Sequence, residues 1–268
     1  MGAMVIDTWE DGDRYEPYVG RWSRLVAHEF LDWLACPGGG RWLDVGCGTG
    51  ALSETILTRA EPAEVQGIDA SAEFVKYANG RIEDARFEAR VADTRTIPFD
   101  GATFDATVCG LVLNFLPDQG GVIQEFRRVT RPGGRIGAYV WDYTGAMQMM
   151  RYFWDAAADI DPRAREHDEG ERFHDIASMK GLGSLFEVAA LDDIRTRSID
   201  VPTIFRDFDD YWVPFLGGQG AAPAYLMTLE DAARAELREL LRMRLPVEED
   251  GTIRLTARAW AVRGTVPT

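Results

Sequence analysis

The chain has 268 residues, of which 46% are hydrophobic and 27% are charged, the composition of a globular protein with a sizeable core. Its formal net charge is −15, and Lys and Arg form no cluster along it. Because nucleic-acid binding usually needs a basic face, these values argue against DNA or RNA as a partner.

Cysteine spacing and hydropathy argue against a disulfide-rich, metal-binding or membrane-spanning protein. Cys36, Cys47 and Cys109 are odd in number and lack a Cys-x-x-Cys spacing, so neither a disulfide framework nor a metal site is indicated. The sequence shows no apolar run of about 18 residues and no signal peptide. We therefore expect a cytoplasmic protein with no bound metal and no membrane span.

The first half of the chain alternates between strand and helix patterns. After a polar start over 7–17, Val19–Leu34 has the apolar spacing of an amphipathic helix, which Pro37 and the following glycines end. Expected strands then cover Arg41–Val45, Val65–Asp69, Arg86–Ala92, part of Phe104–Asn114 and Arg135–Trp141. Expected helices cover Ala51–Ala60, a segment from the N-cap Ser71 to Asn79 that Gly80 stops, and Asp118–Arg128. Such alternation predicts an α/β fold with a doubly wound, mostly parallel sheet.

The pattern changes after Trp141. Residues 142–185 carry a helix rich in Met and aromatic residues, followed by a charge-dense stretch from Asp155 to Asp175. Strand character returns at Ile194–Val201, an amphipathic helix covers Leu229–Leu245, and a last strand covers Ile253–Val262. We expect a single domain over residues 1–268. Its expected parts are a lid at 7–35, a core at 36–141 and 186–268, and a cap inserted at 142–185.

The segment Leu43–Gly50, LDVGCGTG, is the most informative in the chain. A strand pattern runs into glycines at positions 46, 48 and 50, and a helical pattern follows at once. A loop of this kind brings backbone N–H groups and the positive end of a helix dipole up to a ligand. Asp44 adds a carboxylate near the tip of the strand. The loop therefore suits a nucleotide-like ligand that carries a cationic group.

Carboxylates fall at the ends of the first three expected strands: Asp44, Asp69 and Asp93. In a doubly wound sheet the carboxyl ends of the strands converge on one crevice. An acid after the second strand suits hydrogen bonds to ribose hydroxyls, and one after the third can accept from the exocyclic amine of adenine. The three acids with the glycine loop predict a site for an adenosine-containing cofactor.

Taken in order, these segments resemble the class I, Rossmann-like methyltransferases that depend on S-adenosylmethionine, in the small-molecule branch that includes the ubiquinone/menaquinone biosynthesis enzymes. The similarity spans roughly residues 15–141. It rests on Leu43–Gly50, Gly67–Ser71, Ala92–Thr94, Ile97–Phe99, Phe104–Ala106, Leu111–Leu116 and Arg128–Gly134. The resemblance implies a seven-stranded sheet with an antiparallel last strand, S-adenosylmethionine as cofactor, and methyl transfer to a small molecule.

The resemblance also implies roles for individual residues. The loop glycines would let the backbone approach the methionine part of the cofactor, whose amino group Asp44 would orient. Asp69 would hold the ribose hydroxyls, and Asp93 would accept from the adenine amine. The full implied set is Asp44, Gly46, Cys47, Gly48, Gly50, Asp69, Ala70, Asp93, Thr94 and Gly110, with Tyr18 and Arg21 from an N-terminal lid that also holds Tyr15 and Trp22.

Two other classes of function stay open at this point. Gly46-x-Gly48-x-x-Ala51 also satisfies the dinucleotide pattern, and Asp69 follows about 20 residues later, as in an NAD(P)-linked oxidoreductase. Asp44 before the loop, Asp93 after the third strand and the lid-like helix favour the methyl donor. A cofactor-binding protein without catalysis is the other alternative.

The acceptor side of the site is less clear from the sequence. Methyl transfer from a sulfonium is an in-line displacement, so the protein mainly aligns a nucleophile and excludes water. The candidate for a catalytic base is His174. The expected acceptor contacts are Asn114, Trp141, Tyr143, Met147, Phe153 and Tyr211, which suit a small, partly apolar molecule. We expect this small molecule as the partner and leave a homodimer open.

Overall fold

The computed structural model describes residues 16–218 and 220–268, so Tyr15 and the expected polar start before it lie outside the described residues. Contacts between the described residues cluster in two compact units. Unit 1 holds residues 16–22, 142–174 and 200–258, and unit 2 holds residues 23–141, 175–199 and 259–268. This grouping differs from an insertion over 142–185 alone, and the single-domain organisation stays a prediction.

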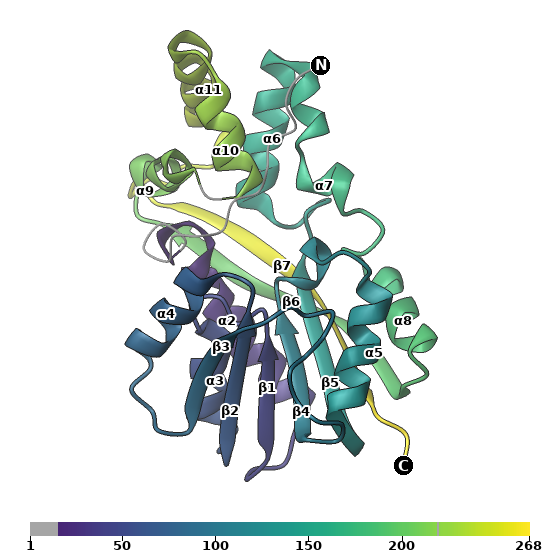
Figure 1. Cartoon of the computed structure of the whole chain (residues 1–268). Coiled ribbons are helices and arrows are strands. Elements are labelled where there is room, and N and C mark those ends of the chain that lie inside the picture. The colour runs from purple at the N-terminus through teal and green to yellow at the C-terminus, as the bar shows by residue number, and fades with distance from the viewer. Residues whose placement is uncertain (1–15, 219) are drawn as a thin grey trace. The chain divides into compact units, whose positions relative to one another are not determined.

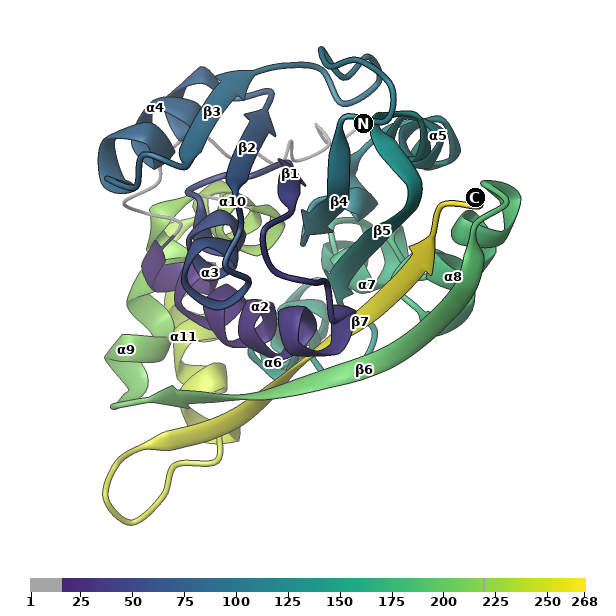
Figure 2. The ribbon, with the colours of Figure 1, turned by 90° about the horizontal axis from the view of Figure 1, so that it is seen from below.

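One sheet of seven strands runs through the described residues, in the order β3-β2-β1-β4-β5-β7-β6 (Figure 1). Its strands are β1 (Arg41–Val45), β2 (Glu64–Asp69), β3 (Phe87–Val91), β4 (Phe104–Gly110), β5 (Thr130–Trp141), β6 (Asp192–Phe205) and β7 (Ile253–Thr265). Strands β1 to β5 pair in parallel, whereas β7 runs antiparallel to β5. Figure 2 shows β7 and β6 as a long ribbon beside them. The predicted α/β fold, with its mostly parallel seven-stranded sheet and antiparallel last strand, is confirmed.

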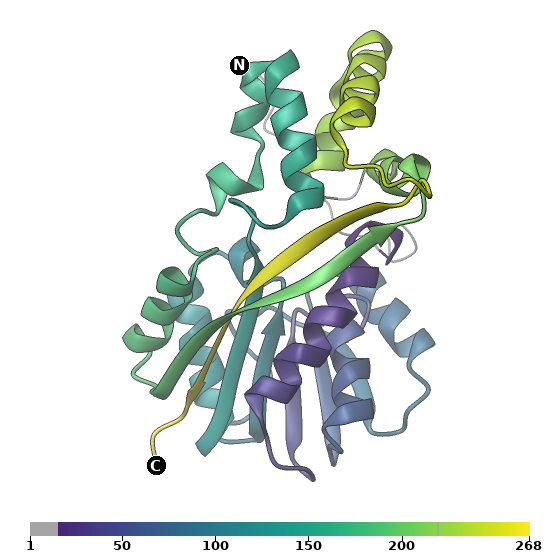
Figure 3. The same cartoon turned by 180° about the vertical axis from the view of Figure 1, so that it is seen from behind.

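Helices cover both faces of this sheet. They are α2 (Arg21–Leu34), α3 (Ala51–Arg59), α4 (Ala72–Arg81), α5 (Gln119–Val129) and α8 (Met179–Val188). In Figure 1 α5 lies in front of the sheet, and in Figure 3, seen from behind, α2 does. On α2, the fully buried Phe30 and Leu34 pack over Gly137 of β5, where a Cβ would lie only 2.7 Å from the Phe30 ring. The missing side chain at Gly137 thus allows the helix to approach the sheet.

Unit 1 is built around aromatic side chains. Its elements are a π-helical turn (Glu16–Gly20), α6 (Gln148–Ile160), a 3-10 turn (Pro162–Glu166), α7 (Glu169–Arg172), α9 (Phe208–Trp212), a 3-10 turn (Val213–Gly217), α10 (Ala221–Thr228) and α11 (Asp231–Arg244). Phe153 of α6 stacks on Phe215 with ring centroids 4.8 Å apart, and Tyr18 meets Phe215 edge-on at 5.3 Å. These rings fix the inward faces of the short helices.

The expected elements differ from the observed ones in several places, among them β5 and β6, which begin at Thr130 and Asp192 and are longer than expected. α4 is capped by Ser71 as predicted but continues through Gly80 to Arg81, since one exposed glycine near a helix end costs only about 1 kcal/mol. Residues 142–185 hold α6, a 3-10 turn and α7, and they enter α8, instead of one helix and a charged stretch. α10 was not expected, because its run AAPAYLMT is apolar nearly all round and shows no helical period.

Candidate functional site

The glycine loop between β1 and α3 is held against β2 by its own backbone. The N–H groups of Gly46 and Cys47 both donate to the carbonyl of Ile68, at 2.8 and 3.0 Å. Gly46 and Gly48 have φ angles of +72° and +52°, where a side chain is strained. A Cβ on Gly46 would lie 2.7 Å from Val112, whereas a Cβ on Gly48 would meet no atom within 4 Å. Gly48 is therefore where open space reaches the loop backbone.

Asp69, at the end of β2, ties this loop to the start of α4. One carboxylate oxygen accepts from the N–H of Gly48 and the other from the N–H of Ser71, both at 2.9 Å. Burial raises the pKa of Asp69, while these backbone donors lower it. A carboxylate oxygen can accept a second hydrogen bond, so the predicted role toward ribose hydroxyls is compatible with this geometry. Ala70, the next residue, is exposed.

Asp44 lies in β1 below the loop, and its side chain is buried. Its Oδ2 accepts a hydrogen bond from the hydroxyl of Ser53 on α3 at 2.7 Å. Burial raises the pKa of Asp44 to about 7, with the charge of Asp69 adding to the rise and the Ser53 bond opposing it. Ser53 was not among the expected site residues. Its signal in the sequence is weak, because a hydroxyl in the first turn of a helix usually bonds locally.

Cys47 of the loop turns its side chain into the core. It packs with Val75, Ala78 and Ala89, and a Cβ on Gly67 would lie 2.9 Å from its sulfur. Burial raises the pKa of its thiol well above the ordinary value, so the thiol stays neutral. Any contact of Cys47 with a ligand therefore falls to its backbone. Gly50, the N-cap of α3, accepts from the N–H of Glu54 and donates its own N–H to the carbonyl of Cys47.

Asp93, after β3, has an exposed carboxylate that is already engaged. The guanidinium of Arg95 contacts both of its oxygens, with the shortest distance 2.6 Å, and the Arg95 N–H donates to it at 2.9 Å. This contact lowers the pKa of Asp93 to about 2. Asp93 is therefore ionised at neutral pH, and an adenine amine would have to share it with Arg95. Thr94 beside it is buried.

The segment after β4 carries an unpartnered polar group. Asn114 is 3% exposed, and neither its Oδ1 nor its Nδ2 has a hydrogen-bond partner among the described residues. The segment is fixed upstream, where the N–H of Leu111 donates to the Tyr139 carbonyl and Gly110 leaves room for the Tyr139 ring. Since Val112 packs on Gly46, this segment and the glycine loop lie side by side. A buried amide left unpaired usually marks a place where a ligand or water belongs.

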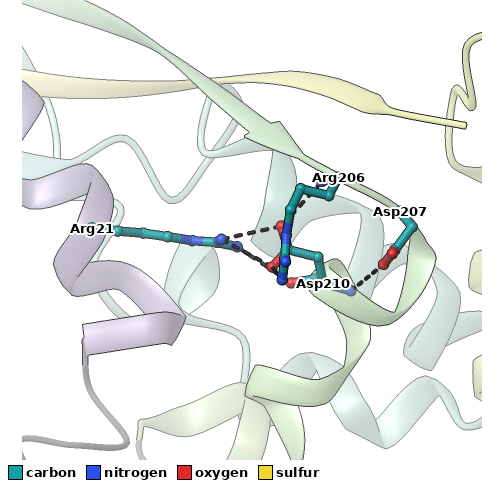
Figure 4. Close-up of polar contacts among 4 residues, drawn as sticks. All are labelled: Arg21, Arg206, Asp207 and Asp210. Atoms are coloured by element: carbon teal, nitrogen blue, oxygen red, sulfur yellow. Dashed lines mark hydrogen bonds and ion pairs between the residues drawn. The ribbon is translucent and has the colours of Figure 1, made fainter. Parts of the chain in front are cut away.

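Arg21, expected in the lid over the cofactor, has a protein partner in unit 1. Its Nη1 lies 3.2 Å from both carboxylate oxygens of Asp210, and its guanidinium packs over the rings of Trp22 and Phe205 (Figure 4). Asp210 also accepts from Arg206. This pair joins residues 189 positions apart, so no local pattern in the sequence could indicate it. Its contact with the cofactor stays a prediction.

The other expected contacts in unit 1 are buried in its aromatic core. Tyr18, Tyr143, Met147, Phe153 and Tyr211 are each 3% exposed or less. The hydroxyl of Tyr211 donates to the Met149 carbonyl at 2.8 Å. Trp141, in unit 2, is equally buried at the end of β5. Packing therefore accounts for these side chains, and their contact with an acceptor stays a prediction.

His174, the candidate for a catalytic base, is the last residue of the 142–174 segment of unit 1. Its side chain is exposed, and its Nδ1 is 2.9 Å from the carbonyl oxygen of Glu171. The other expected acceptor contacts of unit 1 are buried, whereas His174 is exposed, and its role as a base stays a prediction. In the described part of the chain no group of three metal-ligating side chains is found, and no helix there is long and apolar enough to cross a membrane.

Comparison with known proteins identifies the type of domain. Residues 43–138 match a family model described as a methyltransferase domain. The chain is 29% identical over 198 residues to a demethylmenaquinone methyltransferase of Lysinibacillus sphaericus, an alignment that covers 69% of this chain and 81% of the relative.

Solved structures share the fold. The YcgJ protein of Bacillus subtilis has a TM-score of 0.60 at 17% identity, with 91% of this chain and 99% of that chain covered. Phosphoethanolamine N-methyltransferase 2 of Haemonchus contortus, solved with S-adenosylmethionine, has a TM-score of 0.57 at 14% identity, with 92% and 53% covered.

These matches decide between the cofactors that the glycine loop alone left open. The matched segment contains the loop, Asp69, Asp93 and the segment after β4, so the dinucleotide reading of the same glycines is set aside. The cofactor is S-adenosylmethionine, and the methyl group goes to a small molecule. Residues 43–138 therefore form a methyltransferase domain, and the chain is similar to small-molecule methyltransferases that depend on S-adenosylmethionine.

Proposed function

We propose that S-adenosylmethionine binds along the carboxyl ends of β1, β2 and β4 in unit 2. The open space over Gly48 supports this placement, because a cofactor can reach the backbone there without displacing a side chain. Asp44 and Asp69 supply carboxylates toward the cationic methionine end and the ribose. The residues present therefore fit the cofactor, and Asp93, Thr94 and Gly110 would complete the contacts.

The same proposal makes Asn114 the contact for the methyl acceptor. Its buried carboxamide offers one acceptor and two N–H donors and has no partner among the described residues. This observation supports the assignment of the acceptor. A buried amide without a hydrogen-bond partner costs free energy, and a hydrogen bond to a bound ligand offsets that cost. The acceptor would present a carbonyl or hydroxyl next to an apolar body. The demethylmenaquinone in the name of the Lysinibacillus relative is of this kind.

The protein has to supply little chemical activation for this reaction. The sulfonium of the bound cofactor supplies an already activated methyl group. The chain's own residues would hold the acceptor in line with it and keep water out, a contribution of alignment more than of acid–base catalysis. The net charge of −15 supports a small-molecule partner over a nucleic acid. A homodimer and a cytoplasmic location are further parts of this proposal.

Calorimetry with S-adenosylhomocysteine tests the cofactor half of the proposal. The protein should bind it, while NAD⁺ and NADH should give no heat of binding and no shift in Tm. Methyl transfer from labelled S-adenosylmethionine to hydroxylated and carbonyl-bearing aromatic acceptors tests the other half. Absence of any affinity for S-adenosylhomocysteine would overturn the cofactor site. Turnover restricted to fully apolar or to highly charged acceptors would overturn the role of Asn114.

A further inference from the structure

The hydroxyl of Ser53 makes an unusual choice of partner within α3. Thr55 and Thr58 of the same helix donate to carbonyls one turn back, Ala51 at 2.7 Å and Glu54 at 3.0 Å. This is the ordinary habit of a hydroxyl inside a helix. Ser53 instead donates to the Asp44 carboxylate on β1 at 2.7 Å, and both side chains are fully buried. The bond therefore joins the helix after the glycine loop to the strand before it.

Among the residues that the structure describes, no positively charged group faces Asp44. The titratable groups that face it are Asp69 on β2, Cys47 in the loop and Cys109 on β4. Both thiols are neutral, because burial raises the pKa of each, and Asp69 is an acid. Asp44 has no ion pair within residues 16–218 and 220–268. A buried carboxylate without a cation is costly, so a cationic ligand group is its natural complement.

We propose that Ser53 is a positioning residue for cofactor binding, whose hydroxyl holds the Asp44 carboxylate in place and in its charged form for the cationic methionine end of the cofactor. The inference rests on the proposed cofactor site. It follows that cofactor affinity depends on pH. The charged form of Asp44 binds the ammonium group, so affinity rises as pH increases through the Asp44 pKa of about 7, up to the pH at which the ligand's own ammonium group loses its proton.

The Ser53→Ala variant distinguishes positioning of the Asp44 carboxylate from a role of Ser53 in folding alone. Loss of the donor raises the pKa of Asp44 further, so the midpoint of the affinity curve moves up by about one pH unit. Calorimetry with S-adenosylhomocysteine between about pH 5.5 and pH 9 measures this curve. The Kd of S53A should exceed that of the wild type by about tenfold below neutral pH, and the two curves should approach each other at high pH.

Two other variants complete the design. Thr55→Ala removes a buried hydroxyl two residues away on the same helix and should leave the pH midpoint unchanged. The Asp44→Asn variant has no carboxylate to titrate at this position, so its affinity should be weak and should show no rise around pH 7, and adding S53A to it should change nothing further. Far-ultraviolet circular dichroism checks that each variant is folded. If S53A does not fold, Ser53→Cys keeps a weak donor of similar size and should shift the midpoint by a smaller amount.

The possible failures can be told apart. No binding by the wild type at any pH would overturn the cofactor site itself. Binding by the wild type together with an S53A curve that is unshifted, or displaced by the same factor at every pH, would overturn the role of Ser53 and leave the cofactor site standing.

Discussion

Arg21 and Asp210 form an ion pair within unit 1. The sequence alone predicts a different contact for Arg21, namely the cofactor. The pair is only partly exposed, at 29% for the Arg21 side chain and 11% for that of Asp210. The Nη2 of Arg21 also donates to the Asp210 backbone carbonyl at 3.3 Å. Asp210 is further fixed by its own N–H, which donates to the carboxylate of Asp207 (Figure 4). The start of α2 is therefore joined to α9 by charge as well as by packing.

Replacing Arg21 by Ala should lower the free energy of unfolding by about 1–2 kcal/mol, because it removes charge-assisted hydrogen bonds from a partly buried carboxylate. Arg206→Ala is the control, since that side chain is 83% exposed and contacts the same carboxylate, and its cost should stay within about 0.5 kcal/mol. Urea denaturation measures both. Equal losses of unfolding free energy in the two variants would contradict a larger contribution from Arg21 than from Arg206.

The same pair makes a contribution to stability that depends on pH. Arg206 and Arg21 lower the pKa of Asp210 against the opposing effect of burial. An acid with a lowered folded pKa stabilises the protein above its unfolded pKa of about 3.9, and the contribution is lost as pH falls through the folded value. The difference in stability between wild type and R21A should therefore shrink below about pH 4. A difference that is constant down to pH 2 would exclude an electrostatic origin.

Asn114→Ala should lower kcat/KM by about tenfold to a hundredfold while leaving the Kd for S-adenosylhomocysteine within about twofold, because the lost hydrogen bonds go to the acceptor. Asn114→Leu should lose activity equally and gain about 1 kcal/mol of stability, since it removes a buried polar group that has no partner. Steady-state kinetics and thermal unfolding together check this. A strongly destabilised Asn114→Leu would show that the amide is paired in the folded protein.

Gly46→Ala and Gly48→Ala should fail in different ways. Both positions have positive φ, which costs about 1–2 kcal/mol for a residue with a side chain. A Cβ on Gly46 also collides with Val112, so that variant should be destabilised further. A Cβ on Gly48 projects into open space, so that variant should fold and yet lose at least tenfold in cofactor affinity. Intact cofactor binding by G48A would argue against a ligand at this point.

The ion pair of Arg151 with Asp168 should be the larger electrostatic contribution to unit 1. Its side chains are 16% and 4% exposed, and both oxygens of Asp168 accept from the guanidinium, at 2.8 and 2.7 Å. Asp168→Ala should cost about 3 kcal/mol, because it leaves the largely buried Arg151 guanidinium with the exposed Asp155 as its ionic partner. Asp155→Ala removes the 65% exposed partner of the same arginine and should cost less than about 0.5 kcal/mol. Chemical denaturation compares the two.

The sequence by itself determined the mostly parallel sheet and favoured S-adenosylmethionine over a dinucleotide as the cofactor. Strand and helix periods, the glycines at 46 and 48 and the acids at the strand ends are local signals, and the parallel order of the sheet then brings those ends together. Ser71, which a local rule names as a helix cap, does cap α4. Such features could be predicted because each depends on residues only a few positions apart.

Only the tertiary structure decided what the remaining side chains contact. The sequence positions of Phe153 and Tyr211 are compatible with a hydrophobic core or with the lining of a substrate site. In the structure both rings are buried against Phe215, which lies on a different element from either of them. Arg21 could not be assigned from its neighbours, because its partner lies on α9. Nothing in the sequence distinguishes Ser53 from other hydroxyl residues in helices, and its bond to Asp44 of β1 is seen only in the structure. The physical reason is the same throughout: partners far apart in the chain are chosen by packing, which leaves no period or spacing in the sequence.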